Sequence, residues 1–249
     1  MSARLALVLI VVSAAPAWAD HVDAESSSPT TFELAQDSAF APTIARADTR
    51  GDGVAIAAMN YDRATRATTL DIAGDLALAG ALHLVLRVDN VASHGRPGVG
   101  ASYQFLSEAK HGVSSTAYLA YKTEGFTEPE GEIEGLVAFG KTFGPFRGVI
   151  NAAYGQDADG KERDGELAVH VHTPIGTRVL VGATGRYRDA LGSGGDHGVL
   201  RDAFGGLTAT VAVGPVGITT MAGVAGIETT GMTSMTVGPS VTLAVGSGF

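Results

Sequence analysis

Two histidines, His170 and His172, stand two positions apart in the segment "GELAVHVH". Side chains at that spacing in a strand point to the same face, so the pair could supply two imidazole ligands to a metal ion. No third ligand is evident nearby in the sequence. We therefore favour a polar strand face whose histidines meet water, and we expect no bound metal and no cofactor.

A dense acidic stretch, "DADGKERDGE", comes just before these histidines and contains Asp157, Asp159, Asp164 and Glu166. Its carboxylate density resembles that of a calcium-binding loop. The stretch lacks the full spacing of a twelve-residue calcium loop, in which ligands recur at fixed positions. An exposed acidic hairpin is the interpretation that we favour.

Three arginines, Arg178, Arg186 and Arg188, share one face of "TRVLVGATGRYRD" if that segment is a strand. As a basic ladder inside a channel they could guide anions. As a structural feature they could instead pair with carboxylates such as Asp71, Asp75 or Glu166. The sequence leaves both interpretations open.

Serine chemistry has weaker support. A serine esterase needs a serine and a histidine within hydrogen-bond reach, together with a group that orients the histidine. Ser102 and Ser114 are available, but neither lies in a nucleophile-elbow motif. With no cysteine in the chain, a thiolate nucleophile is excluded as well. We expect that the protein is not an enzyme.

The elements that carry these residues are two-faced strands. In "TTLDIAGDLAL" leucine and isoleucine alternate with Thr69, Asp71 and Asp75. In "LHLVLRVD" leucine and valine alternate with residues that include Arg87. A period of two with one apolar and one polar face is typical of strands in an antiparallel sheet. Arg87, Asp71 and Asp75 therefore join the histidines and the three arginines as candidates to line a pore.

The connections between the strands alternate in length. Short links such as "AGA" (79–81), "FGPF" (143–146), "TPIG" (173–176) and "GPVG" (214–217) are interleaved with longer polar ones. Outer-membrane barrels show this alternation, because their periplasmic turns are short and their outer loops are longer. The predicted strands are 53–60, 67–78, 81–89, 97–107, 113–123, 131–143, 145–156, 164–173, 177–188, 201–214, 216–228 and 232–249. An antiparallel up-and-down transmembrane β-barrel of about 12 strands is the expected fold.

The first residues predict export. "MSARLALVLIVVSAAPAWAD" has Arg4, an apolar run and a small-residue "AWA" site, which are the three regions of a cleavable signal peptide over residues 1–19. Residues 20–52 are rich in Ser, Pro and Asp without a sustained period and predict a polar periplasmic lead segment before the barrel at 53–249. No apolar run after the signal is long enough for a spanning helix.

Charge and composition limit the partners. The formal net charge is −9, or about −10 once Arg4 is removed with the signal, which argues against nucleic acid. A small exported chain without cysteine has no disulfide framework and must be held together in another way.

The chain ends on "SVTLAVGSGF", where Val241, Leu243, Val245 and Phe249 stand in phase on one apolar face. With the signal and the alternating strands, this ending resembles a Gram-negative outer-membrane β-barrel. The resemblance implies outer-membrane lipid and the barrel-assembly machinery as partners, with these four residues as an assembly signal. Ser247 and Pro239 depart from the usual pattern of such a strand.

A second resemblance lies in "YQFLSEAKHGVSSTAYLAYKT" and "EGLVAFGKTFGPFRGVINAAYG", which are similar to the barrels of phenol-degradation operons, a family associated with uptake. The expected function is therefore a passive, porin-like channel for small solutes in the outer membrane. The alternatives are a non-conducting structural or surface-interaction barrel and, last, a lipid-modifying enzyme. The sequence does not identify the solute.

Overall fold

The structure is a computed structural model that describes residues 54–62, 67–91, 95–126, 130–160, 162–191, 199–214, 216–229 and 236–248. The predicted signal peptide, the predicted lead segment and Phe249 lie outside these residues. Within the described residues no helix is both long and apolar enough to cross a membrane.

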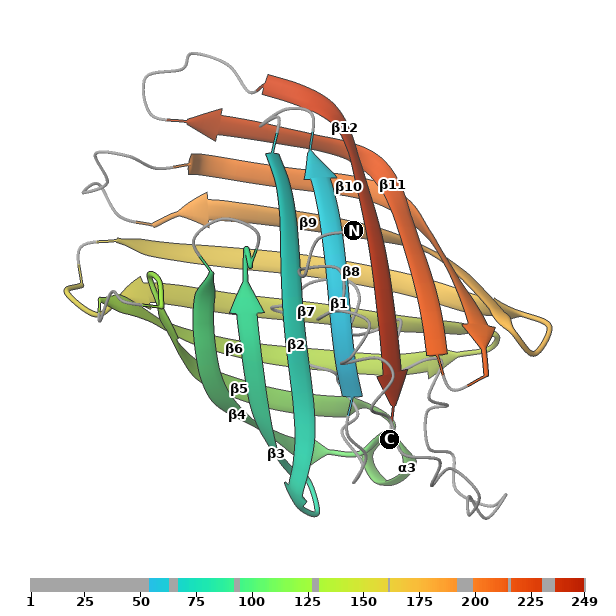
Figure 1. Ribbon diagram of the computed structural model, residues 1–249. Coiled ribbons are helices and arrows are strands. Elements are labelled where there is room, and N and C mark those ends of the chain that lie inside the picture. Colours follow the sequence, from blue (N-terminus) through green and yellow to red (C-terminus); the bar gives the residue numbers. More distant parts are fainter. Residues whose placement is uncertain are drawn as a thin grey trace.

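Twelve antiparallel strands, all within the described part of the chain, close into one barrel (Figure 1). They are β1 (Val54–Asp62), β2 (Ala67–Ala79), β3 (Leu82–Asp89), β4 (Arg96–Leu106), β5 (Ser114–Thr123), β6 (Gly131–Phe143), β7 (Phe146–Asp157), β8 (Arg163–Ile175), β9 (Val179–Ala190), β10 (Val199–Val213), β11 (Val216–Thr229) and β12 (Thr236–Gly248). Each strand pairs with its neighbours in sequence, and the predicted up-and-down barrel is confirmed.

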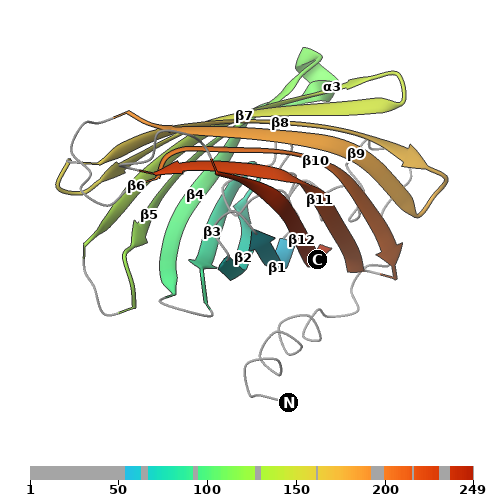
Figure 2. The ribbon, with the colours of Figure 1, turned by 90° about the horizontal axis from the view of Figure 1, so that it is seen from above.

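The barrel closes where the first strand meets the last. β1 pairs with β12 from Val54 opposite Gly248 to Asp62 opposite Ser240, and it pairs with β2 on its other side. Figure 2 shows the strands curving round to make this contact. Closure leaves no sheet edge with unpaired backbone groups, which is a requirement for any sheet in a lipid bilayer.

Polar side chains reinforce this closing seam. The Asn60 amide on β1 donates to the Asp71 carboxylate on β2 at 2.9 Å, and its carbonyl accepts from the Thr242 hydroxyl on β12 at 2.6 Å. Asp71 also accepts the backbone N–H of Asn90 at 2.7 Å, which ties the link after β3 to the same network. One side chain of β1 therefore connects both neighbouring strands.

Four of the short turns contain a glycine in the left-handed region, where side chains with a Cβ are strained. These are Gly80, Gly144, Gly176 and Gly214, with φ between 56° and 68°. The turn predicted at 173–176 is corrected by this geometry, because β8 continues through Pro174 to Ile175 and the chain reverses at Gly176.

The link between β4 and β5 is longer than the other turns at its end of the barrel. It contains a single helical turn, α3 (Glu108–His111), that ends at Gly112 with φ 72°. The Glu108 carboxylate accepts the backbone N–H of Thr142 at 2.6 Å and the Arg147 guanidinium at 3.2 Å. The link is thereby attached to the hairpin formed by β6 and β7.

Exposure alternates along the strands as the period of two predicts. On β5, for example, Leu119 is 62 % exposed whereas its neighbours Tyr118 and Ala120 are buried. The exposed apolar side chains point outward and the buried polar ones point into the barrel. On β12 the outward set includes Val241 and Leu243, as predicted.

Candidate functional site

The inner face of the barrel carries many buried polar side chains. Histidine, asparagine, glutamine, serine, threonine and charged side chains from all parts of the barrel lie there and are buried or half-buried. The buried members on the described strands include Asp71, His83, Arg87, Ser102, Gln104, Thr116, Lys122, Glu132, Glu134, Asn151, His170, His172, Thr208, Thr210, Thr219, Ser240 and Thr242. This lumen is the candidate site.

The first half of a charged belt lies on β3 to β6, near the end with the longer loops. Arg87 donates to Glu134 at 2.9 Å and to Asp89 at 2.5 Å, although Glu134 is on β6, three strands away from Arg87. The Arg87 side chain can cross the intervening strands because Gly98 has no side chain; a Cβ there would lie 3.0 Å from Arg87 Cγ. The guanidinium is thus held against the wall.

Lys122 and Arg96 complete this half of the belt. The Lys122 ammonium lies 3.0 Å from Glu132 and 3.5 Å from Glu134. Arg96 lies 3.6 Å from Glu132 and 3.0 Å from Glu124 at the rim. Each of these cations therefore has carboxylate partners in the low-dielectric wall, where ion pairs are screened less than on an open surface.

The second half of the belt lies on β8 to β10. Arg186 pairs with Asp202 and lies 3.9 Å from Glu166, and Arg188 pairs with Asp164. Gly155 on β7 lies between the two halves. The Glu132 and Asp164 carboxylates both occupy the space that a side chain at Gly155 would fill. The belt therefore continues from β3 to β10.

The structure separates the three arginines of the predicted ladder. Arg186 and Arg188 face the lumen from the end of β9 that is next to the longer loops. Arg178 is exposed in the short turn at the other end, before β9 begins at Val179. The ladder is interrupted, and the two lumenal arginines are paired with carboxylates.

His170 and His172 lie side by side on the inner face of β8. Both are buried, and His172 Nδ1 is 3.0 Å from His170 Nε2, so one imidazole donates to the other. Among the described residues, no group of three or more potential metal ligands is found. The two imidazoles are hydrogen-bonded to each other on the β8 wall.

The acidic stretch divides between two strands. Asp157 ends β7, Asp159 lies in the turn, and Asp164 and Glu166 face the lumen on β8. The two last residues belong to the charged belt, so the stretch contributes to the mouth of the lumen in addition to forming a hairpin.

A serine lies beside a paired histidine and aspartate inside the barrel. His83 Nδ1 lies 2.5 Å from Asp75 on β2, and His83 is the register partner of Ser102 on β4. However, Ser102 Oγ is buried and makes no hydrogen bond within the described part of the chain, so the serine–histidine contact that activates a nucleophile is not formed.

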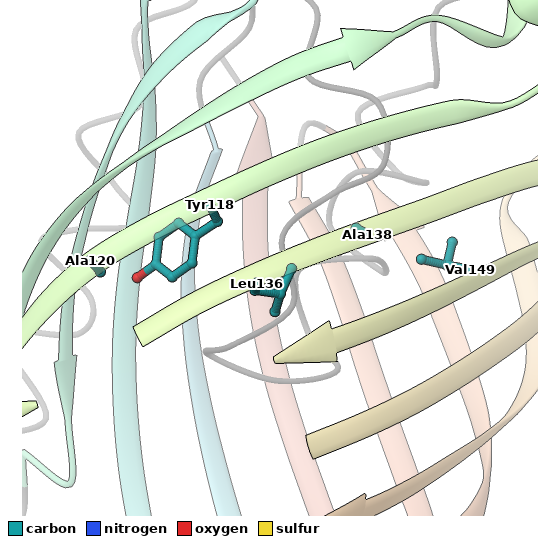
Figure 3. Close-up of a cluster of buried hydrophobic side chains, with 5 residues drawn as sticks. All are labelled: Tyr118, Ala120, Leu136, Ala138 and Val149. Atoms are coloured by element: carbon teal, nitrogen blue, oxygen red, sulfur yellow. The ribbon is translucent and has the colours of Figure 1, made fainter. Parts of the chain in front are cut away.

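An apolar cluster covers part of the inner wall on β5, β6 and β7. It consists of Tyr118, Ala120, Leu136, Ala138 and Val149, which Figure 3 shows on these three neighbouring strands. Tyr118 and Leu136 are direct register partners. The cluster forms an apolar strip on this part of the wall, and a second buried cluster, Ala58 with Ala244, lies at the closing seam.

Sequence reasoning missed several members of the belt. Lys122, Glu132 and Glu134 were not singled out, although they stand in the same phase as other inward-facing residues. The alternation of charged and apolar residues is visible in "GEIEGLVAF", where Glu132 and Glu134 flank Ile133. These residues could have been identified as charged side chains that alternate with the apolar residues of their strands.

A closed, antiparallel up-and-down barrel with a polar lumen and an apolar outer face is the architecture of porins and related channels. Solved structures agree with this class. A NanC porin superposes with a TM-score of 0.57 at 9 % identity, covering 78 % of this chain and 98 % of that chain. A KdgM porin in complex with disordered oligogalacturonate gives a TM-score of 0.54 at 10 % identity, covering 80 % of this chain and 99 % of that chain.

An outer membrane channel from Pseudomonas putida F1 also gives a TM-score of 0.54 at 10 % identity, covering 81 % of this chain and 97 % of that chain. At these identities the likeness concerns the fold. No protein-family model and no curated protein matches this chain. The narrower resemblance to barrels of phenol-degradation operons stays a prediction.

Proposed function

We propose that this protein is an outer-membrane barrel that acts as a passive channel for small hydrophilic solutes. The observation that carries the proposal is the opposite polarity of the two faces: charged and hydroxyl side chains line the lumen, while large apolar side chains cover the outside. Burying an outward face of this kind in lipid is favourable, and a polar interior suits water and solutes.

The outward aromatic residues support a membrane location. Four tyrosines lie towards the end with the longer loops, and five aromatics lie towards the other end. The first group is Tyr61, Tyr121, Tyr154 and Tyr187, and the second is Tyr103, Phe105, Phe139, Phe143 and Phe146. In outer-membrane barrels, two rings of aromatic residues flank the lipid-facing band. In this orientation the short turns face the periplasm.

Other functions have less support. A serine hydrolase built on Ser102 and His83 would need the hydroxyl to contact the imidazole, and among the described residues Ser102 Oγ makes no hydrogen bond. The porins and channels that share the fold support transport, and the formal charge of −9 does not favour nucleic acid. A non-conducting structural barrel remains the alternative outcome of the test.

The test is single-channel recording after the chain, without residues 1–19, is refolded and inserted into a planar bilayer. We expect discrete current steps, because the inner wall is polar and charged. A matched preparation without residues 20–52 shows whether that segment limits the current. A barrel that inserts, resists protease and never conducts in either form would contradict the proposed function and would favour the structural alternative.

A further inference from the structure

We infer that the lumen selects small cations, inorganic ions or organic amines, over anions. This inference rests on the proposed channel function and identifies the class of solute that the channel favours. It follows from the number, the pairing and the placement of the charges on the inner face.

The lumenal charges are not balanced. Among the inward-facing strand residues whose side chains the structure describes, nine are carboxylates and six are arginine or lysine, an excess of three negative charges. The carboxylates are Asp71, Asp75, Asp89, Glu132, Glu134, Asp157, Asp164, Glu166 and Asp202, and the cations are Arg87, Arg96, Lys122, Arg147, Arg186 and Arg188. In a low-dielectric wall, an excess of one sign raises the local concentration of the opposite ion.

Carboxylates also neutralise the cations locally. Each of the six lies within 4.0 Å of at least one carboxylate, which for Arg147 is Glu108 of α3 and for the other five includes members of the charged belt. A permeating anion therefore meets arginines whose charge is already compensated. A continuous row of unpaired arginines, which could attract anions, is absent from the described wall. Arg186 and Arg188 are paired with carboxylates, and Arg178 lies outside the lumen.

Among the described residues, no cation lies within 4.0 Å of the Asp71 carboxylate. Asp71 is buried and accepts hydrogen bonds from two neutral donors, the Asn60 amide and the Asn90 backbone N–H. Neutral donors stabilise the ionised form but leave its charge in place. Within the described part of the chain, the Asp71 carboxylate is therefore not compensated by an ion pair.

The described inward residues of the opposite wall, on β11 and β12, carry no charge. The described inward residues of β11 and β12 are small, apolar or hydroxyl-bearing, including Thr219, Ser240 and Thr242. The Thr210 and Thr219 hydroxyls are hydrogen-bonded to each other at 2.7 Å. The described charges that face the lumen therefore lie on the wall from β2 to β10.

The experiment measures the reversal potential in a planar bilayer under a KCl gradient. We expect the K⁺ permeability to exceed the Cl⁻ permeability severalfold. Neutralising three carboxylates together, Asp71→Asn, Asp157→Asn and Glu166→Gln, removes the excess and should bring the permeability ratio close to one. The matched control is Asp189→Asn with Glu228→Gln, two outward-facing carboxylates at the same end of the barrel, which should leave the ratio unchanged.

The outcomes separate the two proposals. A conducting wild-type channel that prefers Cl⁻ or shows no preference would overturn the cation inference and leave the channel function standing. A barrel that does not conduct would overturn the channel function and, with it, the inference. If a K⁺-selective channel keeps its ratio in the triple variant, the three carboxylates do not set the selectivity and the inference in this form is wrong. Circular dichroism and heat-modifiable mobility of each variant confirm that it is folded.

Discussion

Arg87→Met should destabilise the folded barrel by about 3 kcal/mol, the lower end of what is measured when one partner of a buried ion pair is removed. The reason is the pair of carboxylates that would remain: Glu134 is 6 % exposed and Asp89 is 17 % exposed at the side chain. We expect a loss of stability at the lower end of this range because Lys122, 3.5 Å from Glu134, still partly compensates its charge. Equilibrium urea unfolding in lipid vesicles measures the change.

Two further variants identify the cause. Arg87→Met combined with Glu134→Gln should recover part of the stability, because the uncompensated charge is removed. Arg201→Met is the matched control, since Arg201 faces outward, is 52 % exposed and also has two carboxylate neighbours. Such an exposed pair contributes about 0–1 kcal/mol. Equal losses for Arg87→Met and Arg201→Met would contradict the role assigned to the belt.

Gly223→Ala should destabilise the barrel by about 1–3 kcal/mol, the usual cost of overpacking. Gly223 on β11 faces Gly206 on β10, and a Cβ at Gly223 would lie 2.6 Å from the Gly206 Cα. That neighbour is backbone and cannot move aside as a flexible side chain could, so β10 and β11 would have to separate. The lost stability appears as a lower midpoint in the same unfolding experiment.

Gly205→Ala is the matched control for this prediction. Gly205 lies on the same pair of strands, and a Cβ there would meet nothing within 4 Å. Alanine at that position should be neutral or slightly stabilising, since glycine weakens a strand. If both alanine variants unfold at the same urea concentration, the close approach at Gly223 has no energetic consequence and the prediction is wrong.

The strands were predictable because their signal is local. Alternation of apolar and polar residues assigned Leu207 to the outside and His170 to the inside, and the structure places them so. The observed bounds of most strands differ from the predicted ones by one or two residues. At Gly176 the shift is two residues on both sides of the reversal, where the turn conformation decides the end of the strand, and β12 begins four residues later than predicted.

The contacts in the lumen could not be predicted in the same way. Arg87 and Glu134 are 47 positions apart and on strands that are not neighbours, so their contact depends on the stagger of the barrel and on the space left by Gly98. The sequence left open whether the three arginines form a ladder or pair with carboxylates for a related reason: Arg178 has the phase of Arg186 and Arg188 but lies in a turn, where phase no longer fixes direction. Phe249 and the assembly signal stay predictions.

The measurement that tests the channel most directly is the effect of a thiol reagent on its current. The chain contains no cysteine, so a single introduced cysteine is the sole target. Thr184 and Ala183 are neighbours on β9, and the register places Thr184 on the lumenal face with His170 and Ala183 on the outer face with Val171. Each is replaced by cysteine and exposed to a water-soluble methanethiosulfonate that carries a trimethylammonium group.

We expect the current through the Thr184→Cys channel to fall in discrete steps as the reagent attaches inside the lumen. The Ala183→Cys channel should keep its full current, because its thiol faces lipid. A fall for Ala183→Cys with no change for Thr184→Cys, or equal behaviour of the two conducting variants, would contradict a solute path through the lumen of this barrel.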